Sequence, residues 1–119
     1  MFDIPNIWKV SWNKNWYNYN QLIDDYNNQR FSGIICQKKG IAKMKRLPKI
    51  KDIVYISCNK FKIMKCIVIS DFFEASIFDK YTYTKSDKIE QYCLIKIVEI
   101  YENPEELKGN QRTWVTYTN

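Results

Sequence analysis

The chain has 119 residues and a net charge of +6, which fits a single domain over residues 1–119 and excludes a two-domain arrangement. No stretch approaches 18 apolar residues, and the N-terminus lacks the basic and apolar regions of a secretory signal, so we expect no membrane span and no leader. The chain contains no His and no CxxC pair. We therefore expect a non-catalytic binding domain that holds no metal and no cofactor.

The distribution of charge and cysteine indicates the kind of partner and compartment. Residues 1–65 carry a balance of +9 and residues 66–119 a balance of −3. Clustered positive charge beside aromatic residues is typical of a polyanion-binding protein, although a solvated lysine-rich face explains the same pattern. Cys66 and Cys93 lie in apolar runs, which predicts buried thiols and an intracellular, reducing compartment, with a disulfide as the alternative. The heavy use of Lys, Ile, Asn and Tyr suggests an AT-rich genome, such as that of a large DNA virus.

The first elements along the chain are a strand and a helix. Alternating apolar residues predict a strand over residues 7–12. Apolar side chains spaced by three and four residues then predict a helix over residues 17–28. Either Asn18 or Asn20 is suited to cap the start of this helix.

The middle of the chain is dominated by apolar runs that predict strands. A short strand is expected over residues 31–36, where Gly33 indicates a close backbone approach or a bulge. A helical turn over residues 40–47 follows and ends at a proline. Two further strands, over residues 52–57 and 61–70, are joined by a connection short enough for an antiparallel hairpin.

The last part of the chain predicts a loop, a strand, a helix and a final strand. Residues 79–91 are polar without a clear period and indicate a long loop, whereas residues 92–101 give the strongest strand signal. A cap, a proline and two acids predict a short helix over residues 103–109, and a strand is expected over residues 112–118. The fold class is therefore α+β: a small curled mixed sheet or pseudo-barrel of about six strands with two or three short helices.

Several segments resemble EVE domains, which belong to the PUA-like superfamily together with the YTH and ASCH families. The opening segment IWKVSWNKNWYNYNQLI resembles the family's Trp-containing strand followed by an aromatic helix start. The family's next motifs are matched by Phe31-Ser32-Gly33-Ile34, Met44-Lys45 and Lys51-Asp52. The sequence departs from the family at Ile35-Cys36, where EVE domains usually carry Arg-Asn. The resemblance covers about residues 7–102 and implies a PUA-like barrel whose pocket holds a modified base of DNA or RNA.

Base binding needs aromatic faces, hydrogen-bonding groups and cations for phosphates. The stacking candidates are Trp12, Trp16 and Phe31; a core position explains Trp12 equally well, while packing explains Trp16 least. Edge contacts are expected from Ser32, Gly33, Ile34, Ile35, Ser57, Cys58 and Asn59, of which Asn59 is explained equally by an ordinary turn. The predicted phosphate contacts are Lys38, Lys39, Lys43, Lys45, Arg46, Lys60 and Arg112.

Two other function classes compete with this hypothesis of a nucleic-acid reader. The first is a protein–protein adaptor on a PUA-like scaffold that has lost base binding, which the missing Arg-Asn favours. The second is a small nuclease or base-processing enzyme, for which Asp71 and Glu74 are candidate cation ligands at a spacing that is common by chance.

Overall fold

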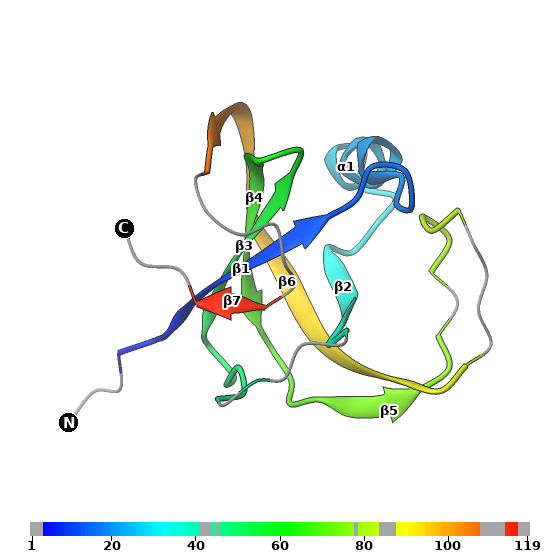
Figure 1. The fold of residues 1–119 in the computed structure, drawn as a ribbon. Helices are drawn as coiled ribbons and strands as arrows, with labels where there is room; N and C mark the ends of the chain where they lie inside the picture. The colour runs from blue at the N-terminus through cyan, green and yellow to red at the C-terminus, as the bar shows by residue number, and fades with distance from the viewer. Residues whose placement is uncertain are drawn as a thin grey trace.

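A mixed β-sheet curls around the hydrophobic core, and one short helix covers an end of it (Figure 1). The computed structural model describes residues 4–40, 44, 46–77, 79–83, 88–107 and 114–116. In chain order the elements are β1 (Ile7–Trp12), α1 (Tyr19–Asn27), β2 (Ile34–Lys38), β3 (Ile53–Cys58), β4 (Phe61–Val68), β5 (Phe73–Ala75), β6 (Glu90–Glu106) and β7 (Val115–Thr116).

The long strand β6 organises the sheet because three strands pair with it. The strand order is β2-β6-β4-β3-β1-β7, and β5 pairs with β6 beside this path. All of these pairs are antiparallel except β1–β3, which is parallel. The predicted hairpin of β3 and β4 is confirmed, and its turn has positive φ angles at Asn59 (51°) and Lys60 (71°). Such angles suit a two-residue hairpin turn.

The sheet curls until side chains of its two ends meet, but the hydrogen-bonded ladder stays open. On one side, the Trp12 indole Nε1 donates to Gln37 Oε1 at 2.8 Å, which joins β1 to β2. On the other, the Trp114 Nε1 donates to the Lys38 carbonyl oxygen at 2.9 Å. The predicted curled mixed sheet is therefore confirmed, whereas a closed barrel is not formed by the described strands.

The inner face of the curled sheet forms the core. Apolar residues alternate along β1, β3 and β4, and those on the inner face are almost fully buried. All four cysteines are free thiols, and Cys66 and Cys93 are buried as predicted. Burial raises the pKa of the Cys66 thiol and raises the pKa of Cys93 to about 12, so neither is a ready nucleophile.

The helix α1 is confirmed, and it packs against the start of β2. The Asn18 side chain accepts a hydrogen bond from the Gln21 backbone N–H at 3.2 Å and caps the helix. Gly33 has a φ of +89°, and a Cβ atom there would lie 2.9 Å from a ring carbon of Tyr26. This contact confirms the close approach that was expected at Gly33. No helix in the described part of the chain is long and apolar enough to cross a membrane.

The helix predicted over residues 103–109 is wrong, because residues 103–106 extend β6. Glu105 and Glu106 pair with Lys62 and Phe61 at the start of β4. The register shifts between Met64 and Lys62, and Pro104 lies opposite this irregular stretch, where a missing N–H is tolerated. Pairing with β4 thus overrides the local helix-start signals, which is a common outcome for short segments.

Other boundaries also differ from the expectations. The strand predicted over residues 31–36 begins and ends later, at Ile34–Lys38, because the positive φ of Gly33 precedes it. The predicted loop over residues 79–91 ends at Glu90, where β6 begins, and β5 was not predicted. The described residues contain seven strands and one helix. Residues 41–43 and 45 of the turn predicted over residues 40–47 lie outside them.

A buried carboxylate fixes the parallel pair of β1 and β3. Asp52 directly precedes β3 and is only 4% exposed. Its carboxylate accepts hydrogen bonds from the Trp8 indole (3.0 Å), the Asn6 backbone N–H (3.1 Å) and the Lys49 backbone N–H (2.8 Å). These bonds hold the start of β1 beside the start of β3, in the register that pairs Trp12 with Cys58.

We expect Asp52→Ala to lower the free energy of unfolding by roughly 2–4 kcal/mol, because it leaves buried donors without an acceptor. Chemical denaturation measured by circular dichroism checks this. Asp71→Ala is the matched control, since Asp71 is exposed, and it should change stability by less than about 0.5 kcal/mol. Equal losses in the two variants would contradict this role of Asp52.

Candidate nucleic-acid site

Four aromatic rings meet where the end of β1, the start of α1 and the segment after β5 come together. Trp12 and Tyr17 lie 4.6 Å apart between ring centroids, Tyr17 and Tyr81 lie 6.2 Å apart, and Phe31 packs edge-on against Tyr81 at 5.6 Å. We refer to Trp12, Tyr17, Phe31 and Tyr81 as the aromatic cluster. Tyr81 is buried, and the other three rings are half-buried and pack against the core.

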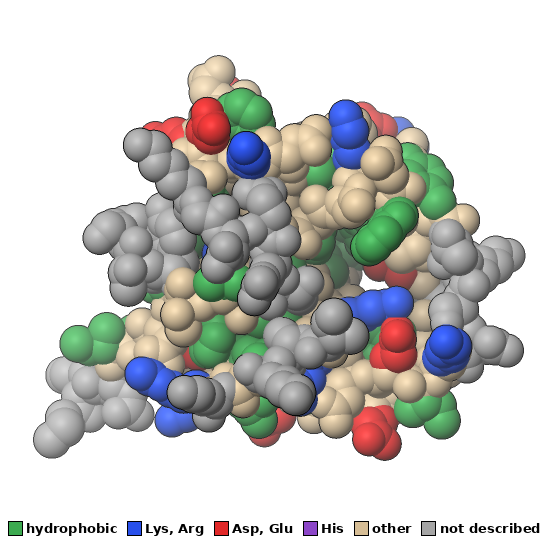
Figure 2. Space-filling model, in the orientation of Figure 1, with side chains coloured by type: hydrophobic (Ala, Val, Ile, Leu, Met, Phe, Trp, Pro, Cys, Tyr) green, Lys and Arg blue, Asp and Glu red, His purple; other side chains and the backbone are tan. Residues whose placement is uncertain are grey.

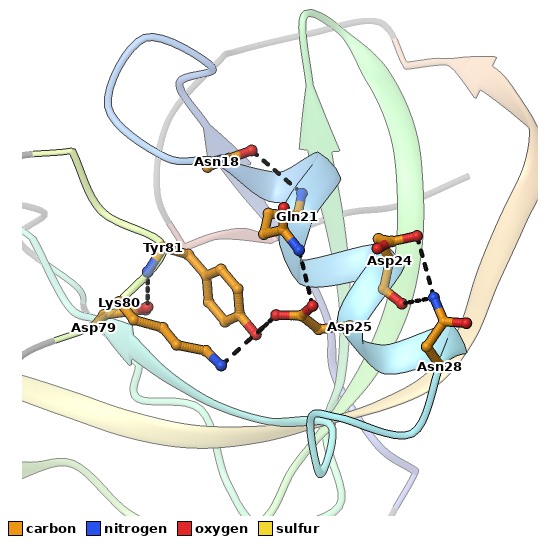
Figure 3. Close-up of polar contacts among 8 residues, drawn as sticks. All are labelled: Asn18, Gln21, Asp24, Asp25, Asn28, Asp79, Lys80 and Tyr81. Atoms are coloured by element: carbon orange, nitrogen blue, oxygen red, sulfur yellow. Dashed lines mark hydrogen bonds and ion pairs between the residues drawn. The ribbon is translucent and has the colours of Figure 1, made fainter.

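A buried carboxylate of α1 anchors the aromatic cluster (Figure 3). The Tyr81 hydroxyl donates to Asp25 Oδ2 at 2.8 Å, and Gln21 Nε2 donates to Asp25 Oδ1 at 2.8 Å. The Lys80 ammonium group lies 3.6 Å from the same carboxylate. The hydrogen bond from Tyr81 is the main reason that the pKa of Asp25 is lowered, and Lys80 and Arg30 add to this effect. Burial raises the pKa of Tyr81 to about 12, so its hydroxyl remains a donor.

A second carboxylate, Asp79, holds the other side of the cluster. Its Oδ2 accepts a hydrogen bond from the Tyr17 hydroxyl at 2.9 Å, and its Oδ1 accepts one from the Tyr81 backbone N–H, also at 2.9 Å. Burial, followed by the negative charge of Asp79, raises the pKa of Tyr17. Polar contacts at their hydroxyl groups therefore fix the orientation of the Tyr17 and Tyr81 rings.

An open hollow of about 610 Å³ lies at the C-terminal end of α1. Figure 2 shows one face of the molecule, on which Lys and Arg side chains lie scattered among acidic and hydrophobic ones. We call the hollow the α1 hollow and define it by its lining, which consists of Tyr26, Asn27, Gln29, Arg30, Phe31 and Ser32. The lining combines two aromatic rings, polar groups that donate and accept hydrogen bonds, and one permanent cation, and it includes no carboxylate.

The α1 hollow brings together some of the predicted base contacts. Phe31 and Ser32 line it directly, and Phe31 also belongs to the aromatic cluster. Gly33 and Ile35 are buried, and Ile35 is part of the core. Ile34 is 41% exposed at the first position of β2.

The other predicted base contacts do not line the α1 hollow and instead take part in packing, hydrogen bonds or a turn. Trp12 belongs to the aromatic cluster, and its indole N–H is already bound to Gln37. The Ser57 hydroxyl bonds the Ser11 hydroxyl at 3.0 Å, and Cys58 is buried. Asn59 occupies the hairpin turn, which agrees with the alternative interpretation as an ordinary turn residue.

Trp16 lies at the opposite end of α1 from the hollow, in the turn before the helix. Its side chain is 70% exposed, in line with the expectation that packing explains it least. Folding therefore leaves this large aromatic ring open to solvent.

The four predicted phosphate contacts that the structure describes are not gathered in one patch. Lys38 pairs with Glu90 at 2.8 Å, and the Lys39 ammonium lies 6.0 Å from the Phe72 ring centroid. Lys60 is exposed in the hairpin turn at the start of β4, and Arg46 is exposed in the segment before Asp52. The remaining three predicted contacts, Lys43, Lys45 and Arg112, lie outside the described residues.

Sequence reasoning missed several residues that build this site. Tyr26 was placed on the buried face of the helix, but it also lines the α1 hollow. Arg30 directly follows the helix, so its exposure could have been foreseen. Tyr81 and Asp79 lie in the predicted loop, and only the tertiary structure brings them to α1.

The described residues contain no group of three or more Cys, Asp or Glu side chains placed to hold a metal ion. Asp71 and Glu74, the candidate cation ligands, are both exposed.

We expect Tyr81→Phe to lower the melting temperature by several degrees at neutral pH, because Asp25 loses its main hydrogen-bond donor. A lowered pKa in the folded state stabilises the protein above the unfolded value of about 4, and this contribution is lost as the pH falls through the folded value. The difference from the parent protein should therefore shrink below about pH 4. Thermal unfolding between pH 2.5 and 7 tests this, with Tyr83→Phe as the control that removes an exposed hydroxyl. A difference that is constant with pH would contradict this role.

The comparisons with known proteins leave the family open. No protein-family model matches the chain, and searches of curated proteins and of solved structures find no match either. The resemblance to EVE domains therefore rests on the sequence segments alone.

Proposed function

We propose that this chain is an intracellular, non-catalytic domain of PUA-like fold that binds nucleic acid and holds a base in the α1 hollow. The observation that carries the proposal is the lining of this hollow. A base needs an aromatic face, hydrogen-bonding groups at its edge and a cation near its phosphate, and the lining offers all three.

The charge around the α1 hollow supports an anionic ligand. Arg30 lines the hollow, and Lys80 lies on the other side of Asp25. Asp25 lies close to both cations, and its carboxylate also accepts hydrogen bonds from Tyr81 and Gln21. The lining itself holds Arg30 and no carboxylate, which favours a phosphate group beside Arg30.

Phe31 is the stacking residue in this proposal. Its ring packs edge-on against Tyr81, which is held in turn by Asp25. The ring is thus oriented before a ligand arrives, and a pre-oriented group loses little conformational freedom on binding.

We expect Phe31→Leu to weaken oligonucleotide binding by about 1–3 kcal/mol, because leucine keeps apolar volume but has no aromatic face. The measurement is a fluorescence titration with labelled single- and double-stranded oligonucleotides, with and without modified bases. Thermal unfolding of the variant confirms that it is folded. Absence of binding by the parent protein even in low salt would reject the proposal.

Arg30→Gln provides a second test that does not affect packing, since Arg30 is exposed. We expect binding to weaken to a similar extent for all oligonucleotide sequences. The slope of log K against log salt concentration should fall by about one, as for the loss of one phosphate contact. The matched control is Arg46→Gln, because Arg46 is also exposed but belongs to the segment that precedes β3 and does not line the hollow. Equal effects of the two substitutions would indicate a diffuse charge effect instead of a site at the hollow.

A further inference from the structure

Two residues with exposed aromatic side chains lie opposite each other in a short antiparallel contact next to α1. The turn before the helix is closed by hydrogen bonds from the Trp16 and Tyr17 N–H groups to the Asn13 carbonyl oxygen, both at 3.0 Å. Tyr17 then forms an antiparallel bridge with Thr82. The Tyr83 N–H donates to the Trp16 carbonyl oxygen at 3.1 Å, so Trp16 lies directly opposite Tyr83.

Both side chains of this opposed pair lie at the surface. Residues opposite each other in an antiparallel pair have Cβ atoms about 5 Å apart. Tyr17 points inward, since its hydroxyl binds Asp79 and its ring packs against Trp12. Trp16 and Tyr83 are 70% and 61% exposed, so folding leaves both rings open to a ligand.

We propose that Trp16 and Tyr83 form a stacking platform for unpaired bases, so that the ligand of this domain is single-stranded nucleic acid. This inference rests on the proposed function and names its substrate class. Exposed aromatic rings stack on any base whose face is free, whereas the bases of a duplex are already stacked on each other.

Charge complementarity selects nucleic acid over an apolar partner. Lys14 lies in the same turn as Trp16 and is exposed. Lys80 lies three residues before Tyr83, and its side chain stays exposed although its ammonium group lies 3.6 Å from Asp25. The nearest described carboxylate in this segment, Asp79, is half-buried and engaged by Tyr17 and Tyr81. Cations beside aromatic rings are the combination that tracks a single strand.

The platform and the α1 hollow lie at the two ends of the same helix. Trp16 precedes α1 and Phe31 follows it, and a helix of nine residues is about 14 Å long. The segment that carries Tyr83 also carries Tyr81, which contacts Phe31. One short strand of nucleic acid can therefore stack on the platform and place a base in the hollow.

The test compares variants that keep or remove the aromatic face. Single-stranded and duplex oligonucleotides of the same sequence are titrated against the parent protein and Trp16→Phe, Trp16→Leu and Tyr83→Leu. Ile89→Ala is the control, because Ile89 is 72% exposed and has no aromatic face. We expect Trp16→Leu and Tyr83→Leu each to weaken single-strand binding by at least about fivefold, whereas Trp16→Phe and Ile89→Ala retain it.

Other outcomes overturn the platform in distinguishable ways. Unchanged single-strand binding in both leucine variants, with weaker binding by Phe31→Leu, would reject the platform and leave the hollow in place. A preference of the parent protein for duplex would also reject it. Sedimentation that shows a dimer lost in Trp16→Leu would assign the two rings to self-association. Absence of binding to every oligonucleotide would reject the proposed function itself.

Discussion

The register of β1 against β3 depends on the buried carboxylate of Asp52, and the position of the candidate site depends on that register. Three N–H groups donate hydrogen bonds to this single side chain: two come from the start of β1 and one from the segment just before β3. Because the starts of the two strands are fixed, Trp12 at the end of β1 lies beside Cys58 at the end of β3. The turn that follows can then pair with the segment around Tyr81. A single buried acceptor at one end of the sheet thus positions aromatic rings at the other.

The aromatic rings around α1 fall into two groups: inner rings held by carboxylates and outer rings exposed to solvent. Asp25 and Asp79 each bind a tyrosine hydroxyl, so the inner rings are orientated and their polar groups are satisfied. Trp16 and Tyr83, on the outer face of the same contact, remain exposed. The packing of the inner rings therefore accounts for the stability of the region, and the outer rings are left available for a ligand.

Sequence patterns predicted most elements but only part of the candidate site. The apolar runs over residues 52–57 and 61–70 predicted β3 and β4, because each of these strands buries one of its faces in the core. The signals at Asn103 and Pro104 predicted a helix, but pairing with Lys62 made this segment part of β6. Phe31 and Ser32 were predicted from the sequence, whereas Tyr81 and Asp79 were not, since nothing local in a polar loop indicates which helix it will contact.

The sequence by itself determined the alternation of β1, the capped helix α1, the β3–β4 hairpin and the need for a backbone approach at Gly33. These features depend on residues close to one another in the chain, whose spacing and φ angles are local properties. Only the tertiary structure decided that β1 runs parallel to β3, that β6 carries three neighbours and that Trp16 faces Tyr83. Those contacts join segments far apart in the chain, and their choice depends on the burial and hydrogen bonding of the whole sheet, which no local pattern contains.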